Sequence, residues 1–128
     1  MDRGRFRRAV EARDLDDAIG SFAKDAVLHS PVTFKPIEGK AHIGKMLGIV
    51  AEILGDFRYT DQLESNNGTL GLIFRARIGE REVEGIDILR FNKAGLIKDI
   101  TVMMRPRSAL EAFRSEMEAR LASMDYSP

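Results

Sequence analysis

The chain has 128 residues, of which 44% are hydrophobic and 31% are charged, and its formal net charge at pH 7 is +0. This composition is typical of a globular domain with a core of its own, so we expect residues 1–128 to form a single domain. The basic cluster in residues 3–8 is followed directly by acidic residues, which predicts a solvated helix face and no nucleic-acid partner. The absence of cysteine excludes disulfides, thiolate metal sites and cysteine nucleophiles.

The sequence also bears on membranes and cofactors. No apolar run approaches the ~20 residues that span a membrane, and no apolar stretch of a signal peptide follows the N-terminus. We therefore expect a soluble cytoplasmic protein with no membrane partner. The two histidines have no acidic residues at metal-ligand spacing, so neither a metal nor another cofactor is expected.

The first half of the chain is predicted to contain three helices and a short strand. Apolar residues recur every three or four positions in three segments, which predicts helices near 3–13, 14–22 and 41–54. Asp14 is suited to cap the second helix. A strand over 26–30 is expected to end at Pro31, which cannot donate to a ladder, and to lead into a loop.

The second half is predicted to contain four strands and a final helix. The strands are expected near 57–66, 69–78, 81–92 and 96–105, because turn residues separate four β-rich runs. Pro106 then breaks the last strand. Ser108 and Glu111 have capping-box spacing for a helix whose apolar stripe includes Phe113 and Met117.

A two-residue turn at Gly79-Glu80 sets the register of the two strands that it joins. Counting back from the turn places Phe74 opposite Gly85 and Leu72 opposite Asp87. Side chains alternate between the faces of a strand, so Asp87 shares its face with residues that are otherwise apolar or small. A carboxylate is costly to bury without a partner, so Asp87 is either satisfied by a donor or kept for a ligand.

Helices and strands are segregated along the chain, which indicates an α+β fold. We expect a cone-shaped α+β barrel, in which three N-terminal helices pack against a curved, mainly antiparallel sheet and a C-terminal helix follows. A sheet wrapped around the third helix leaves one end of the cone open. Concave, mostly apolar sites of this kind are where small molecules usually bind.

Three motifs carry a resemblance to a known superfamily. They occupy residues 13–19 with 22–27, residues 38–43, and residues 86–95. In this order they resemble the nuclear transport factor 2-like superfamily, which includes SnoaL-like polyketide cyclases and ketosteroid isomerases. The resemblance runs from Phe6 to about Met104 and implies the cone-shaped fold, but the fold hosts many activities.

The resemblance also allows the isomerase mechanism to be compared residue by residue. Ketosteroid isomerase needs a carboxylate base and two oxyanion donors, which are a tyrosine and a protonated aspartic acid. The donor acid falls on Asp87, but the tyrosine falls on Phe6 and the base on Ser30. Phe6 cannot donate a hydrogen bond, and Ser30 is a poor base. We therefore expect no standard ketosteroid isomerase.

A second comparison is with limonene epoxide hydrolase, which resembles this fold and uses an Asp-Arg-Asp set to activate water. The inward row of the last strand here is Ile100, Val102 and Met104, which contains no acid. The Asp-Arg-Asp set of that enzyme is therefore expected to be incomplete in this chain.

Asp87, His29 and Ser30 are the candidate catalytic residues. Asp87 is read either as a pocket acid with a raised pKa or as a structural acid bonded to Tyr59 or Ser30. His29 would replace the missing base, but alternation places it on the side of the strand away from the cone. Tyr59 shares strand parity with Phe57 and Leu63 and is expected to point inward.

Further residues are expected to line the cone and contact a ligand. They are Phe22, Phe34, Met46, Phe57, Tyr59, Leu72, Phe74, Leu89, Val102 and Met104. The outer face of the sheet carries a second apolar group among charges, and members of the superfamily commonly dimerise through this face. A homodimer is therefore expected.

The function predicted from the sequence is binding of a small lipophilic molecule that carries a carbonyl or hydroxyl group. Whether the chain is an enzyme is left open by the sequence. If it is one, Asp87 would serve an isomerase, cyclase or hydratase-type reaction by proton transfer next to a carbonyl. The alternative is a non-catalytic protein-interaction or assembly module. Side chains that fill the interior of the cone would favour that alternative.

Overall fold

The computed structural model describes residues 2–124 of the chain. Four helices and six strands follow one another in the order that the sequence predicts, with one short strand added. They are α1 (Arg5–Glu11), α2 (Leu15–Gly20), β1 (Phe22–His29), β2 (Ile37–Glu38), α3 (Lys40–Ile53), β3 (Gly55–Glu64), β4 (Leu70–Ile78), β5 (Arg81–Phe91), β6 (Ile97–Arg105) and α4 (Arg107–Ser123).

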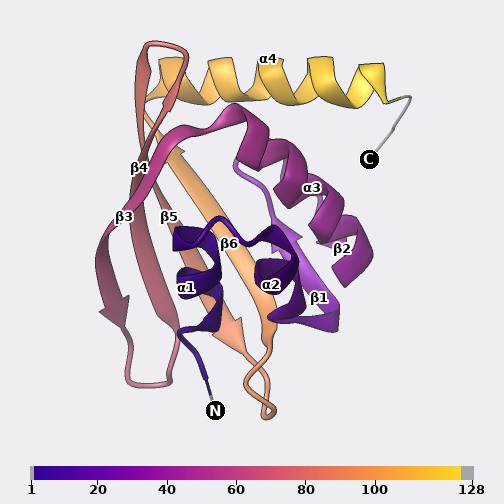
Figure 1. Ribbon diagram of the computed structural model, residues 1–128, viewed down its shortest axis with the longest axis vertical. Coiled ribbons are helices and arrows are strands. Elements are labelled where there is room, and N and C mark those ends of the chain that lie inside the picture. Colours follow the sequence, from indigo (N-terminus) through magenta and orange to yellow (C-terminus); the bar gives the residue numbers. More distant parts are fainter. Residues whose placement is uncertain (1, 125–128) are drawn as a thin grey trace.

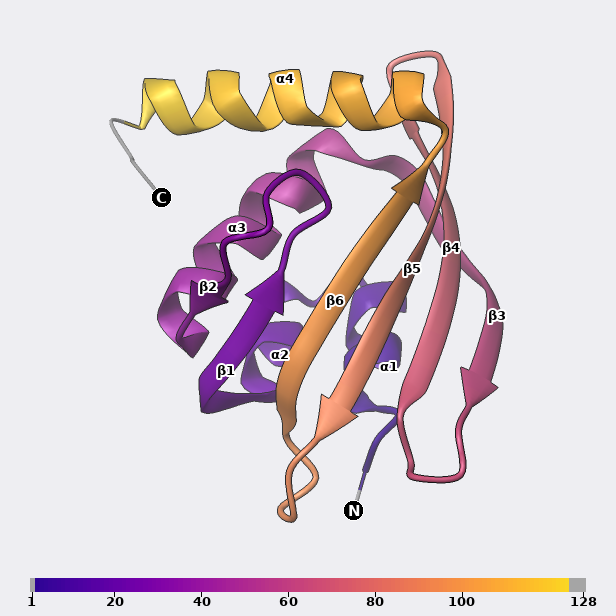
Figure 2. The same ribbon diagram turned by 180° about the vertical axis from the view of Figure 1, so that it is seen from behind.

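The six strands form one curved sheet in the order β2-β1-β6-β5-β4-β3. All its pairings are antiparallel except that of β1 with β6. Helices α1, α2 and α3 lie on the same face of the sheet, as Figures 1 and 2 show from opposite sides. The expected cone-shaped α+β fold is confirmed, with an unclosed sheet wrapped around α3.

The predicted register of β4 and β5 is confirmed. Leu72 pairs with Asp87, and Phe74 pairs with Gly85. The ladder has no bulge between the pair Ile78–Arg81 and the pair Leu70–Leu89. Counting residues from the turn therefore gives the correct partner at every position. Asp87 consequently faces the helices together with Leu72 and Leu89.

Three local expectations are wrong. Phe22 begins β1 instead of ending α2, because α2 stops at Gly20 and the Ile97 amide then donates to the Ser21 carbonyl at 2.9 Å. Ser108 does not cap α4, because the helix starts two residues earlier than expected, with Pro106 as its N-cap. Leu63 is 57% exposed, because a bulge between Tyr59 and Asp61 reverses the alternation of β3.

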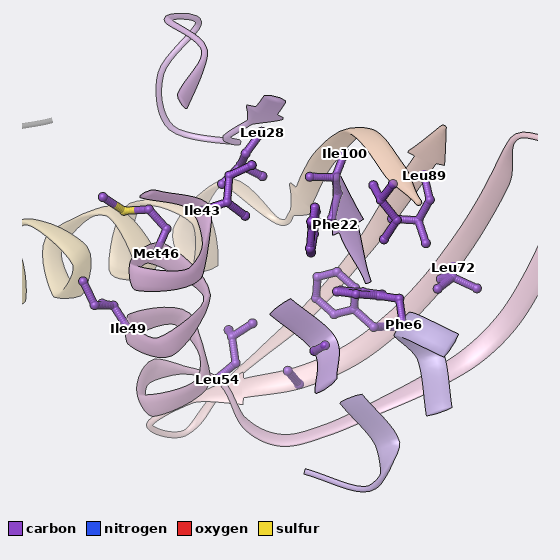
Figure 3. Close-up of a cluster of buried hydrophobic side chains, with 14 of the residues drawn as sticks. Phe6, Phe22, Leu28, Ile43, Met46, Ile49, Leu54, Leu72, Leu89 and Ile100 are labelled. Carbon is purple, nitrogen blue, oxygen red and sulfur yellow. The ribbon is translucent and has the colours of Figure 1, made fainter. Parts of the chain in front are cut away.

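The core fills the narrow end of the cone. Figure 3 shows Phe6 and Phe22 close to Leu72, Leu89 and Ile100. The rings of Phe6 and Phe22 meet edge to face at 5.7 Å, and each of these side chains is at most 3% exposed. Burial of so much apolar surface holds α1 against the sheet.

Helix α4 crosses the sheet at the end opposite to the narrow end, where β6 stops and the β4–β5 hairpin turns (Figure 1). It contacts α3, β4, β5 and β6. Within residues 2–124, no helix has the length and apolar character needed to cross a membrane.

Candidate functional site

A cavity of about 240 Å³ lies between the sheet and the helices. Its walls are mostly apolar, and among its lining residues the buried polar groups are Tyr59 and Asp87. The exposed lining residues are Arg13 and Asp14 from the α1–α2 link, Leu15 at the start of α2, and Ala51 from α3. These exposed residues mark the mouth of the cavity.

Asp87 presents its carboxyl group to this cavity from the middle of β5. Its neighbours across the sheet are Leu72 on β4 and Val102 on β6, and its exposure is only 7%. The Tyr59 hydroxyl on β3 donates a hydrogen bond to Asp87 Oδ2 at 2.8 Å. Of the alternatives open from the sequence, Tyr59 rather than Ser30 is therefore the side chain bonded to Asp87.

Burial controls the protonation of this pair. It raises the pKa of Asp87 to about 7, although the Tyr59 hydrogen bond opposes the rise by stabilising the carboxylate. Burial also raises the pKa of Tyr59 well above its usual value, and the charge of Asp87 adds to that rise. Tyr59 therefore keeps its proton at neutral pH. Asp87 is present there in both its protonated and its ionised form.

The aromatic rings beside the pair fix its position. The Phe57 ring stacks on Phe74 at 4.8 Å and meets Tyr59 edge to face at 5.0 Å. On its outer side Tyr59 lies 5.7 Å from the Arg7 guanidinium, an arrangement that favours a cation–π contact. The hydroxyl is thus held towards Asp87 by the contacts of the ring with Phe57 and Arg7.

The predicted site residues divide into three groups. Eight lie on the wall of the cavity: Ser30, Met46, Phe57, Tyr59, Phe74, Asp87, Val102 and Met104. Phe22, Leu72 and Leu89 are buried in the core at the narrow end, outside the cavity wall. The Phe34 ring is fully exposed on the loop before β2, because the chain there turns away from the cone, so it does not line the cavity as expected.

His29 does not face the cavity. Its Nε2 atom lies 2.9 Å from Asp99 Oδ2 on the outer side of the sheet, where Arg90 Nη1 also approaches Asp99 Oδ1 at 3.7 Å. The expectation from strand alternation is thus met, and His29 is separated from Asp87 by the sheet. Ser30 does line the cavity, and its Oγ accepts a hydrogen bond from the Val32 amide at 3.1 Å.

Sequence reasoning did not select two lining residues on α4, Phe113 and Met117. Their spacing of four residues signals one buried helical face, but it does not tell which part of the sheet that face covers. Among residues 2–124, no cluster of three His, Asp or Glu side chains is placed to hold a metal ion.

This fold and its cavity define a class of cone-shaped α+β proteins with a mostly apolar interior, and the sequence comparison identifies the family. Residues 4–100 match the family model of the SnoaL-like domain. The chain belongs to the SnoaL-like family of the nuclear transport factor 2-like superfamily, as the motifs indicated. No curated protein matches the chain.

Solved structures agree with this assignment. The chain is 41% identical to a steroid delta-isomerase from Pseudomonas aeruginosa, with a TM-score of 0.88 over 93% of this chain and 88% of that one. It is 28% identical to an uncharacterised protein with a cystatin-like fold from Silicibacter pomeroyi, with a TM-score of 0.86 over 93% and 84% of the two chains. Bal32a, from a soil-derived mobile gene cassette, shares the fold at 19% identity, with a TM-score of 0.70 over 85% and 90%.

Proposed function

We propose that this protein binds a small lipophilic molecule in its cavity and that Asp87 donates a hydrogen bond to a carbonyl or hydroxyl oxygen of that molecule. The observation that carries the proposal is the Tyr59–Asp87 pair at 2.8 Å, buried at the wall of an otherwise apolar cavity. Among the described residues, Tyr59 is the side chain that hydrogen-bonds to Asp87. The second carboxyl oxygen is then available to a ligand.

The chemistry of the pair suits a neutral oxygen acceptor. With a pKa of about 7, Asp87 carries a proton in a large fraction of molecules at neutral pH. A neutral acid in an apolar site donates a strong hydrogen bond without the cost of a buried charge. Tyr59 is a permanent donor to Oδ2, so the proton of a neutral Asp87 belongs on the other carboxyl oxygen, where it can face the ligand.

The size of the cavity limits the ligand. Sites for drug-sized molecules usually have volumes of about 300–1,000 Å³. A volume of about 240 Å³ lies just below that range and favours a compact ring compound. Similarity to a steroid delta-isomerase supports a lipophilic ring ketone as the ligand class.

Turnover of the ligand would belong to proton-transfer chemistry. Asp87 would protonate a carbonyl oxygen while water takes the proton from the neighbouring carbon, which gives the enol, and water then returns a proton to Asp87; the same protonation would promote the addition and elimination of water beside the carbonyl. Phe6 and Ser30 occupy the positions that the isomerase resemblance assigns to its tyrosine and base, so we propose no ketosteroid isomerisation by that mechanism. Tyr59 supplies a hydroxyl group from β3 instead.

The test is a thermal-shift screen of cyclic ketones, terpenes and aromatic ketones, each paired with the hydrocarbon that lacks its oxygen. A ligand at 100 times its dissociation constant stabilises the folded state by about 2.7 kcal/mol, which raises the melting temperature on the order of 10 °C for a domain of this size. We expect such a shift for a compact ketone and a much smaller one for its hydrocarbon.

Asp61→Asn on the exposed side of β3 is the matched control, because it removes an acid outside the cavity and should preserve the shift. Asp87→Leu should abolish the difference between ketone and hydrocarbon. Equal shifts for ketone and hydrocarbon in the native protein would contradict the role of Asp87. The absence of any shift across the screen would favour the interaction module instead.

A further inference from the structure

Helix α4 closes the cavity at the end away from the packed core. The SnoaL-like match ends at residue 100, so α4 lies outside the region that defines the family. Figures 1 and 2 show the helix running across the end of the sheet and past the end of α3. Two of its side chains, Phe113 and Met117, nevertheless line the cavity.

The orientation of α4 is fixed by both of its faces. Ala109, Phe113 and Met117, spaced four residues apart, are 0%, 2% and 9% exposed and form the inner face. The outer face is charged, with Arg114 placed between Glu111 and Glu118 at 3.1 and 2.9 Å. An amphipathic helix of this kind has one stable rotation on the sheet, and that rotation directs Phe113 inward.

A second contact ties α4 to the helix beside it. Arg120 Nε lies 3.4 Å from Glu52 Oε2 on α3, close to the end of that helix. Exposed ion pairs contribute little stability, but this pair joins two elements that both line the cavity. Phe113 and Met117 therefore form a wall whose position is set independently of any ligand.

The position of Asp87 determines which way a ligand extends from its polar atom. On the side of Phe91 the next inward residue of β5 is Leu89, which is fully buried and does not line the cavity, so the cavity does not extend along β5 in that direction. On the side of α4, β5 carries Gly85, and a Cβ atom at Gly85 would lie 2.3 Å from Phe74 Cζ. The Phe74 ring thus lies close to the strand, and the cavity wall continues from it through Met104 to Phe113 on α4.

We infer that Phe113 and Met117 are specificity-determining residues that set the greatest length of ligand the cavity accepts. The inference rests on the proposed function and deepens it, because it names compact ring ketones as the ligand class and excludes extended polycyclic ones. A ketone held by Asp87 meets the α4 wall with its far end. A longer ketone has to displace the Phe113 ring from a packed position, which costs binding free energy.

The experiment compares two ketones by calorimetry, a decalone with two fused rings and an androstane ketone with four. The native protein should bind the decalone more tightly than the androstane ketone, by about tenfold or more. Phe113→Ala removes a whole ring from the wall and should reverse this preference. Met117→Ala should reduce the preference in the same direction by a smaller factor.

Leu121→Ala is the matched control, because Leu121 packs against the core from α4 without lining the cavity. It should destabilise the helix to a similar degree and leave the ratio of the two dissociation constants unchanged. Cooperative thermal unfolding establishes that each variant is folded. If Phe113→Ala does not fold, Phe113→Leu and Met117→Ala test the same wall with less loss of packing.

The outcomes separate the inference from the function on which it rests. If the decalone binds but the ratio is the same in the native protein and in the folded wall variants, the inference is wrong and the proposed function stands. If neither ketone binds any of the proteins, both are wrong. A control variant that changes the ratio as much as Phe113→Ala would also overturn the role of the wall.

Discussion

The pKa of the Asp87 carboxyl group is raised because its apolar surroundings oppose its charge. Phe74, Val102 and Met104 share the wall with it, and burial raises its pKa to about 7. The unfolded chain would hold the same proton with a pKa of 3.8. The folded state therefore binds this proton more tightly than the unfolded state does.

Stability should depend on pH through this group with a definite sign. Between pH 4 and pH 7 the folded state carries more protons than the unfolded state, so the free energy of unfolding falls as the pH rises. The contribution is complete below the unfolded pKa and is lost as the pH passes about 7. A shift of this size corresponds to on the order of 4 kcal/mol.

Asp87→Asn isolates the effect, because the amide does not titrate and still accepts from Tyr59. Urea denaturation of both proteins from pH 4 to pH 8 should show the native protein losing stability relative to the variant, by on the order of 4 kcal/mol in total. A constant difference across this range would mean that Asp87 titrates normally in the folded state.

Tyr59 should tune the pKa of Asp87 in the opposite direction to burial. Its hydrogen bond stabilises the carboxylate, so Tyr59→Phe should raise the pKa of Asp87 above about 7, by about one unit or more. Carbon NMR of labelled aspartate carboxyl groups measures the midpoint directly. Thr60→Val, at the neighbouring exposed position of β3, should leave the midpoint in place, and a Tyr59→Phe midpoint that falls would contradict the geometry.

At the residue scale, the sequence was most informative where a strand was regular. Alternation is enough to place Asp87 on the inner face and His29 on the outer face, because both lie on strands without a bulge at that point. Phe34 shows the limit, since a loop has no period and an aromatic residue there can be fully exposed. Strand parity also placed Tyr59 on the inner face, but it failed for Leu63, because no sequence pattern marked the bulge between Tyr59 and Asp61.

At the element scale, the close packing of β4 on β5 depends on Gly85. A Cβ atom there would lie 2.3 Å from Phe74 Cζ and 2.6 Å from the Met103 carbonyl oxygen, and the latter belongs to the backbone and cannot rotate away. Gly85→Ala should therefore lower the free energy of unfolding by about 3 kcal/mol, the upper end of the range for overpacking.

Gly71→Ala is the comparison for this prediction. Its Cβ would lie 3.2 Å from Ile86 Cδ1, the tip of a flexible side chain on the outer face, so the change should be nearly neutral. Denaturant unfolding of the two variants measures both effects. Equal free energies of unfolding would show that the Phe74 ring can move away from residue 85 at little cost. The shape of the cavity beside Asp87 could then change.

The predicted elements differ from the observed ones at their ends. The hairpin β4–β5 was predictable because a two-residue turn defines the pairing of every residue after it. The start of α4 was not, because the helix begins at Arg107 directly after the N-cap Pro106, although Ser108 and Glu111 had the spacing of a capping box. The place of α4 over the cavity depends on tertiary packing, which the apolar stripe of a helix does not encode.

At the scale of the whole molecule, the outer face of the sheet is the surface that no helix among α1–α3 covers. It carries Ile73, Ile86 and Ile88, which are half-buried, and Met103, which is 54% exposed. We propose that two copies of the chain pair through this face. Light scattering at micromolar concentration should then give twice the mass of 14.3 kDa.

Ile86→Lys should weaken this dimer strongly, because a twofold interface places each introduced charge near its copy. The dissociation constant should rise by about 100-fold or more. Ser115→Lys on the exposed side of α4 adds the same charge elsewhere and should leave the mass at that of a dimer. A native protein that scatters as a monomer would contradict the proposed pairing.

The most direct test of the central claim is the affinity of a compact ring ketone measured by calorimetry from pH 5 to pH 9. If protonated Asp87 donates to the carbonyl oxygen, affinity should be constant below about pH 6 and fall about tenfold for each unit above the pKa of about 7. Asp87→Asn, which donates at every pH, should bind with no such dependence. A native affinity that is independent of pH, or an Asp87→Asn variant with the same fall above pH 7, would contradict the account.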